Sequence, residues 1–121
     1  MSAVGTLRVY GIANCDTVKK ARLWLEARGI DYRFHDFRKD GVPDTAIERW
    51  AIDPGWQMLL NRQSKTWRGL DEMEQARACD ASSAVQLLRA HPTLIKRPVI
   101  EWPGGVTVGF DARVCEAIAG R

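Results

Sequence analysis

The spacing of apolar residues changes twice along the first third of the chain. Residues 7–12 are mainly apolar and rich in strand-forming types, which predicts a short strand. Residues 16–28 carry apolar side chains every three or four positions, the spacing of a helix with one buried face. Aromatic residues then recur at alternate positions within residues 32–37, so a second strand is predicted there. A helix of this length between two strands implies that the strands are parallel and share one sheet.

Helices are predicted for the middle of the chain, over about residues 44–91. A turn over 38–44 leads into a helix that ends near Ile52, just before a proline–glycine pair. A polar loop is predicted over 61–68. A further helix over 82–90 has its apolar residues on one face, and a following proline ends it.

Strand spacing returns near the end of the chain. Residues 98–102 and 106–109 are predicted strands, and the proline–glycine–glycine turn between them makes the pair a hairpin. A last helix opens at Asp111, which is a favourable capping residue. Its apolar residues, Ala117 among them, are expected to face inward.

The predicted element order is β-α-β, a helical middle, then β-β-α. This order predicts an α/β fold with a mixed four-stranded sheet covered by helices. It is the thioredoxin-like arrangement, with a helical region of about residues 44–91 inserted between its two halves. At 121 residues the chain is long enough for a single domain over 1–121 with one core.

Composition and charge narrow the classes of function. The chain is 45% apolar and 27% charged, as is typical of soluble globular proteins, and no apolar run approaches the roughly 18 residues that span a membrane. The net charge of +3 comes without a block of lysine and arginine, so we expect neither a membrane nor a nucleic acid as a direct partner. The N-terminal residues lack the pattern of a secretory signal.

Three widely separated cysteines and two isolated histidines match neither a disulfide framework nor a metal site. We therefore expect no metal, no bound cofactor and a cytoplasmic location, where thiols stay reduced.

Cys15 is the main candidate for chemistry. It lies in the turn between the first predicted strand and the first helix, where the helix dipole and free backbone N–H groups favour the reactive thiolate. Asn14 or Asp16 can cap this helix and fix the turn. The Thr17 hydroxyl can donate a hydrogen bond to the sulfur, and Lys19 adds positive charge on the same helix face. The alternative is a buried structural cysteine, the usual state of a free thiol.

The residue three positions after Cys15 decides how the thiol can be recycled. A dithiol oxidoreductase has its second cysteine there, and this chain has Val18. Cys15 must then be resolved by an outside thiol, by Cys79 or Cys115, or not at all. Cys79 and Cys115 are more simply explained as small packing residues.

Four segments of the chain together resemble the ArsC/Spx family, in particular its YffB-type branch of glutathione-dependent thiol reductases. They are residues 11–21, 29–36, 59–61 and 94–99. The resemblance implies a thioredoxin-like fold with a helical insertion and a nucleophilic cysteine at Cys15.

The same resemblance implies a cis proline at Pro98. It also implies that glutathione or substrate binds near Arg97, Pro98 and Val99. Arsenate reductases of the family surround the cysteine with three arginines. Here Arg97 matches, Arg62 is displaced by one position, and the third is missing, which weakens the holding of a doubly charged oxyanion.

The sequence thus predicts a thiol–disulfide oxidoreductase in which Cys15 is the nucleophile and Arg97 supplies positive charge. Asn14, Thr17 and Lys19 would position the thiolate, and Arg62 would join Arg97, Pro98 and Val99 in binding. Glutathione would be the co-substrate, with glutaredoxin and a small-molecule or protein thiol substrate as further partners. The alternatives are an arsenate reductase and an Spx-like regulator that binds RNA polymerase.

Overall fold

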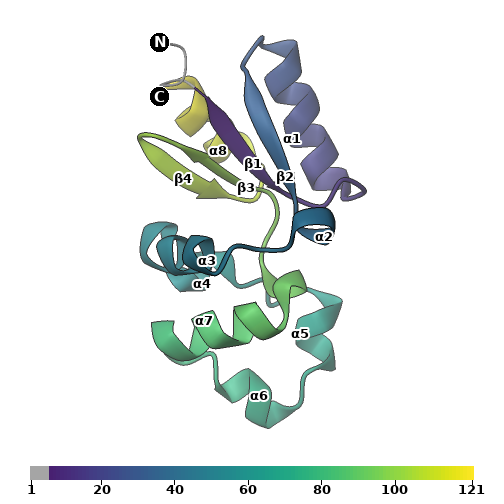
Figure 1. The fold of residues 1–121 in the computed structure, drawn as a ribbon, viewed down its shortest axis with the longest axis vertical. Coiled ribbons are helices and arrows are strands. Elements are labelled where there is room, and N and C mark those ends of the chain that lie inside the picture. Colours follow the sequence, from purple (N-terminus) through teal and green to yellow (C-terminus); the bar gives the residue numbers. More distant parts are fainter. Residues whose placement is uncertain (1–5) are drawn as a thin grey trace. The chain divides into compact units, whose positions relative to one another are not determined.

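The computed structural model describes residues 6–121, apart from the side chain of Asp44. The chain divides into two compact units (Figure 1). The first unit is built from the chain up to Gly41 together with Arg97–Arg121, and the second from Val42–Lys96. The helical region predicted over about 44–91 corresponds to the second unit.

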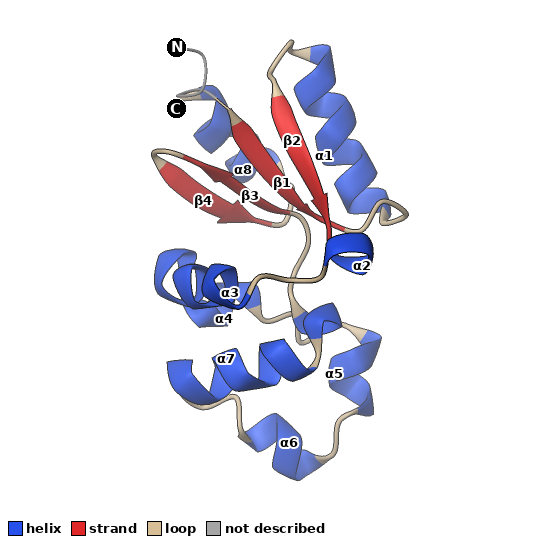
Figure 2. Cartoon of the chain, viewed as in Figure 1, coloured by secondary structure: helices blue, strands red, loops and turns tan. Residues whose placement is uncertain are grey.

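A mixed four-stranded sheet forms the centre of the first unit (Figure 2). Its strands run in the order β2-β1-β3-β4, with β1 parallel to β2 and antiparallel to β3, and β3 antiparallel to β4. This is the thioredoxin-like fold that the element order predicted. The strands are β1 Leu7–Gly11, β2 Tyr32–Asp36, β3 Val99–Trp102 and β4 Gly105–Val108.

Helices α1 (Asp16–Ala27) and α8 (Ala112–Ala119) pack on the same face of this sheet. Leu7, Val9 and Ile100 supply the strand side of the core, because alternate residues of a strand point to one face. The helix side consists of Ala21, Leu25, Val114 and Ile118. Complete burial of a valine, leucine or isoleucine side chain contributes roughly 1.5–3 kcal/mol to folding. Ala117 was expected to face inward but is exposed, because residues 114 and 118, one turn apart, already fill the buried stripe of this short helix.

A short helix, α2 (Phe37–Asp40), replaces part of the turn predicted over 38–44. The Asp36 side chain caps it by accepting a hydrogen bond from the Arg38 N–H at 2.8 Å. Phe37 is buried, and its ring lies near those of Tyr10 and His35, with centroids 6.4 and 6.2 Å away. The Asp36 cap and the packing of Phe37 near Tyr10, a residue distant in sequence, together stabilise this helix.

The second unit is mainly helical. In it α7 packs against α3 and α4, and buries Ala84, Leu87 and Leu88 as the apolar stripe predicted. The chain leaves helical geometry at Asp53, where the break was expected. Its helices are α3 Asp44–Trp50, α4 Trp56–Leu59, α5 Lys65–Gly69, α6 Glu72–Ala76 and α7 Ala81–Ala90, with an irregular turn over Ala51–Gly55 and a 3-10 turn over Pro92–Leu94.

The polar loop predicted over 61–68 is confirmed for residues 61–64 and wrong for residues 65–68, which belong to helix α5. Ser64 starts it, because the Ser64 side chain accepts a hydrogen bond from the Trp67 N–H at 3.1 Å. Serine is a favourable N-cap residue, and the polar composition of the segment concealed this start signal in the sequence.

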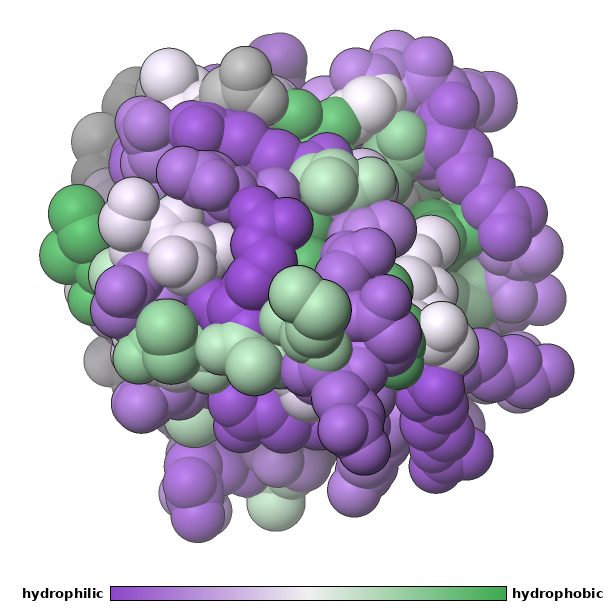
Figure 3. All heavy atoms as spheres, turned by 90° about the horizontal axis from the view of Figure 1, so that it is seen from below, coloured by the Kyte–Doolittle hydropathy of each residue, from purple (hydrophilic) through white to green (hydrophobic). Residues whose placement is uncertain are grey.

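Apolar side chains on the surface are dispersed. The face seen in Figure 3 is mostly hydrophilic, with separate apolar patches. Within residues 6–121, the large apolar residues that are exposed are Leu23, Ile52, Met58 and Met73. None of the helices within residues 6–121 has the length and apolar character needed to cross a bilayer.

Candidate active site

Cys15 lies at the junction between β1 and α1. Its N–H donates to the Ile12 carbonyl at 3.1 Å, which closes a tight turn after the strand. Cys15 is the N-cap residue of α1, with extended backbone angles, and its carbonyl accepts the first helical hydrogen bond from the Lys19 N–H at 2.9 Å. The residue therefore carries its thiol at the positive end of a 12-residue helix, an environment that stabilises negative charge.

The three cysteines are free and differ in exposure. Cys15 and Cys115 are half-buried, whereas Cys79 is exposed. Cys79 is therefore not the packing residue that the sequence suggested. Cys15 combines partial access to solvent with a place at a helix start, which is the combination that reactive cysteines share.

The first turn of α1 packs directly on the end of β1. Val18 is completely buried, and a Cβ atom added at Gly11 would lie 2.7 Å from Val18 Cγ2. This distance is well inside ordinary van der Waals contact, so the close approach requires glycine at position 11. The position where a dithiol enzyme carries its second cysteine is here a packing position that fixes α1, and with it Cys15, against the sheet.

The residues predicted to position the thiolate surround Cys15 in sequence. Asn14 and Lys19 are exposed and Thr17 is half-buried. Neither Asn14 nor Asp16 caps the helix, because Cys15 itself occupies the N-cap position and no side chain there makes a capping hydrogen bond. Asp16 instead begins the helix, where its charge suits the dipole. The positioning roles of Asn14, Thr17 and Lys19 stay predictions.

Arg97, Pro98 and Val99 reach the same end of the sheet as Cys15. Val99 pairs with Tyr10, and β3 runs antiparallel to β1, so β3 begins where β1 ends. Arg97 and Pro98 therefore precede β3 at the end where Cys15 follows β1. The Arg97–Pro98 peptide bond is cis, as the family resemblance implied. The Pro98 carbonyl accepts a hydrogen bond from the Gly109 N–H at 2.8 Å, which ties this segment to the chain just after β4.

The Arg97 guanidinium is only partly satisfied. Its Nε and Nη1 atoms are buried and have no hydrogen-bond partner among the described residues. A buried donor without an acceptor costs free energy, so an anionic group that accepts from these nitrogens would be stabilised there. The structure therefore places a thiol at a helix start and an arginine before β3 at the same end of the sheet.

Arg62 belongs to the second unit, where it precedes α5. Its guanidinium lies over the Trp67 ring, 5.5 Å from the centroid. The arginine is exposed and the tryptophan half-buried. Its assignment to the binding residues stays a prediction.

A group of residues on the other face of the sheet was not singled out from the sequence. The Tyr10 hydroxyl donates to Glu101 Oε1 at 3.0 Å, and burial, reinforced by the Glu101 carboxylate, raises the pKa of Tyr10 above its ordinary value of 10.0. Arg8 lies opposite Glu101 in the register of β1 and β3. The only sequence signal was the alternation of Arg8 and Tyr10 with core residues of β1. Within the described residues no three His, Cys, Asp or Glu side chains group so that they could hold a metal ion.

Comparison with known proteins gives a family match over most of the chain. The sequence profile of the ArsC family matches residues 10–118. The chain belongs to the ArsC family. An uncharacterized protein of Haemophilus influenzae is similar to this ArsC-family chain, with 41% identity over 111 residues, 92% of this chain and 96% of that protein. The global transcriptional regulator Spx 2 of Oceanobacillus iheyensis is 24% identical over 112 residues, which cover 87% of this chain and 77% of the regulator.

Two solved structures of high similarity extend this ArsC-family relationship to three dimensions. A protein called YFFB is 42% identical, with a TM-score of 0.86, covering 93% of this chain and 97% of that one. An arsenate reductase (ArsC) related protein from Brucella melitensis is 46% identical, with a TM-score of 0.73, covering 93% and 92% of the two chains.

Proposed function

We propose that this ArsC-family protein is a thiol reductase in which Cys15 is the nucleophile and glutathione regenerates it. The observation that carries the proposal is the free, half-buried Cys15 at the N-cap of α1, at the end of the sheet where Arg97 precedes β3. Membership of a family with arsenate reductase-related members supports it.

The reaction proceeds in two exchange steps, written here for a substrate that carries a glutathionyl disulfide. The Cys15 thiolate attacks the glutathione sulfur, the substrate S–S bond breaks, and the substrate leaves as a thiolate. A glutathione thiolate then attacks the glutathionyl sulfur on Cys15, which releases oxidised glutathione and restores the Cys15 thiolate. Over both steps, one glutathione thiolate is consumed, the substrate sulfur is released as a thiolate, and the two glutathionyl groups end in one disulfide, so the number of disulfide bonds does not change.

The protein's own groups favour these steps in three ways. The N-terminal end of α1 stabilises the attacking and leaving thiolate at Cys15. Arg97, with Lys19 on α1, supplies positive charge for the carboxylates of glutathione. Val18 provides no second thiol, so the covalent intermediate waits for a glutathione or glutaredoxin thiol from outside. This chemistry needs a reducing compartment, and we therefore expect the protein in the cytoplasm.

Mass spectrometry after treatment with oxidised glutathione tests the proposal. We expect a glutathionyl adduct at Cys15 that reduced glutathione removes, together with turnover of a glutathionylated peptide. Cys15→Ser should lose both, while the matched variants Cys79→Ser and Cys115→Ser should retain both. A disulfide between Cys15 and Cys79 or Cys115 as the resolved product, or equal modification of all three cysteines, would contradict external resolution. Arsenate added as substrate in the same assay measures whether an oxyanion is also reduced.

A regulator is the second candidate function, because the chain is also similar to proteins named global transcriptional regulator Spx, at 24–25% identity over most of its length. A regulator that binds RNA polymerase would be recovered with the polymerase from a lysate, and this recovery would survive Cys15→Ser. A reductase would lose its activity with the same substitution and would not retain the polymerase. The one variant therefore separates the two functions.

A further inference from the structure

One row of side chains crosses the sheet of the first unit on the face that α1 and α8 leave open. Arg33 on β2 pairs with Arg8 on β1, Arg8 pairs with Glu101 on β3, and Glu101 pairs with Val106 on β4. Leu7 and Val9 of β1 point into the helix-covered core, so Arg8 between them points to the opposite face. The register thus places two cations, one anion and one apolar side chain side by side.

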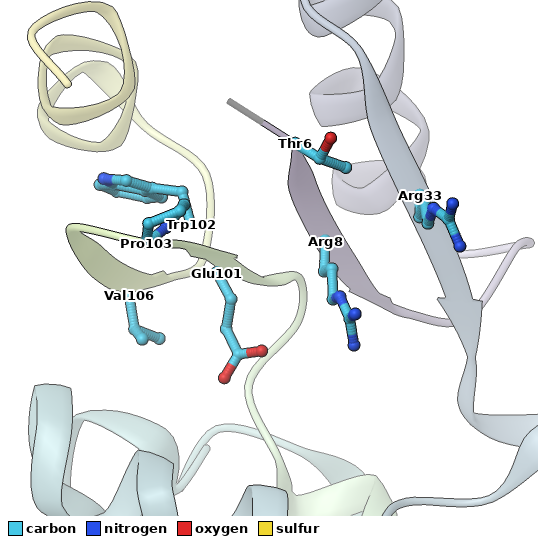
Figure 4. Close-up of a pocket in the computed structure, with 7 residues that line it drawn as sticks. All are labelled: Thr6, Arg8, Arg33, Glu101, Trp102, Pro103 and Val106. Atoms are coloured by element: carbon cyan, nitrogen blue, oxygen red, sulfur yellow. The ribbon is translucent and has the colours of Figure 1, made fainter. Parts of the chain in front are cut away.

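These residues line a pocket of about 500 Å³ formed by the first unit (Figure 4). The guanidinium groups of Arg8 and Arg33 and the Glu101 carboxylate extend to the same side of the sheet, with Val106 beside them, while the Trp102 ring turns the other way (Figure 4). A second pocket of about 220 Å³ shares Arg8 and Arg33. Both arginines are exposed, so a ligand can reach them from solvent.

The charges in this row do not balance. Glu101 lies opposite Arg8 in the register and accepts a hydrogen bond from the Tyr10 hydroxyl at 3.0 Å, so the row holds one carboxylate and two guanidinium groups. No ion pair to the Arg33 guanidinium is present in the part of the chain that the structure describes. Arg8 and Arg33 occupy paired positions on parallel strands, and like charges held close together repel, so a bound anion would offset this repulsion. A ligand that is complementary to this surface would therefore carry one negatively charged group.

We propose that the Arg8–Arg33 pocket is a binding site for the oxyanion group, carboxylate or phosphate, of a small organic molecule. The planar guanidinium groups of the two arginines would each donate to the oxyanion, as arginine commonly does to carboxylates and phosphates. Val106 and Pro103 provide an apolar wall for the rest of the ligand. Arg8 precedes the end of β1 by three residues, about 10 Å along the strand, so the site is separate from Cys15 and needs no thiol.

Amide NMR spectra of the full chain, titrated separately with inorganic phosphate and with succinate, test the site. We expect saturable shifts of the Arg8, Arg33 and Glu101 amide signals with at least one of the two anions. Arg33→Gln should weaken binding roughly tenfold to a hundredfold, because it removes a charged donor. The matched control is Arg113→Gln, which removes the same charge from an exposed position on α8 and should leave the affinity unchanged.

Each outcome of this experiment has a definite meaning. Saturation by phosphate alone or succinate alone supports the site and identifies the ligand's anionic group, and saturation by both supports a general oxyanion site. Absence of saturable shifts at these amides, or equal weakening by the two arginine variants, overturns the proposal. Cys15→Ser should bind as the unmodified protein does, so this site stands or fails independently of the thiol reductase function.

Discussion

The contact between Gly11 and Val18 can be tested by adding one methyl group. Gly11→Ala would place a Cβ atom 2.7 Å from Val18 Cγ2, where ordinary carbon contacts lie at about 3.5–4.0 Å. Gly11 does not have a positive φ, so alanine can adopt its backbone and the clash is the main consequence. Val18 is completely buried, and side chains in closely packed protein interiors have little free volume into which to move.

The expected loss of stability follows from two opposing effects. Overpacking a core position of this kind costs about 1–3 kcal/mol. Replacing glycine in the unfolded chain returns about 0.4–1 kcal/mol, because alanine has less backbone entropy to lose. Gly11→Ala should therefore destabilise the fold by about 1.3 kcal/mol at the centre of these two ranges, and by at most about 2.6 kcal/mol. Val18→Ala should cost about 2 kcal/mol through lost burial and a cavity.

The double variant separates a steric clash from two unrelated losses. In Gly11→Ala/Val18→Ala the new Cβ fills space that the valine methyl groups have left, so the two costs should not add, and a favourable coupling of about 1 kcal/mol or more is expected. Urea unfolding measures all four proteins, and the alkylation rate of Cys15 reports any shift of the first turn of α1. Gly69→Ala is the matched control, because nothing lies within 4 Å of its added Cβ. Full stability of Gly11→Ala, or strict additivity in the double variant, would refute the proposed contact.

Two further substitutions test the first unit. Asp111→Ala removes the side chain that accepts from the Val114 N–H at 3.0 Å, and should cost about 0.5–2 kcal/mol in urea unfolding; an unchanged midpoint would exclude a capping role. Because the pKa of Tyr10 is raised by burial and then by Glu101, stability linked to Tyr10 is present below about pH 10 and is lost as the pH rises through the raised pKa of the folded state. Glu101→Gln should lower the pKa of Tyr10, followed by ultraviolet absorbance, and an unchanged titration would contradict the role of Glu101.

The sequence predicted those elements whose stability is local and periodic. The stripe of Val18, Ala21 and Leu25 identified α1 and its buried face, and all three are completely buried. The change from strand to helix spacing was enough to place Cys15 at the helix start. Helix α2 was missed because it depends on the packing of Phe37 near Tyr10, a contact between residues that no local pattern connects.

The row of Arg33, Arg8 and Glu101 could not be predicted for a related reason. Each residue alternates with core residues in its own strand, so its exposed position was foreseeable. Which of them meet depends on the register of β1 against β2 and β3, and the antiparallel register is set by packing across 91 residues of chain, as the Tyr10–Glu101 hydrogen bond illustrates. A charged residue that one strand alone predicts to be solvated can be assigned to a site only when the residues opposite it on the neighbouring strands are known.

Different residues of strand β1 face the core, face the open side of the sheet and lead into the turn that carries Cys15. Leu7 and Val9 point to the helix-covered core, Arg8 points to the open face, and the strand's end leads into the turn that carries Cys15. Because successive residues of a strand face opposite sides, a change at Arg8 can alter the charge of the open face without opening the core. A change at Cys15 can remove the thiol chemistry without touching either face. Substitutions at these positions should therefore separate stability, anion binding and thiol exchange into independent measurements, whereas a change at Gly11 disturbs the contact that holds α1, and hence Cys15, against the sheet.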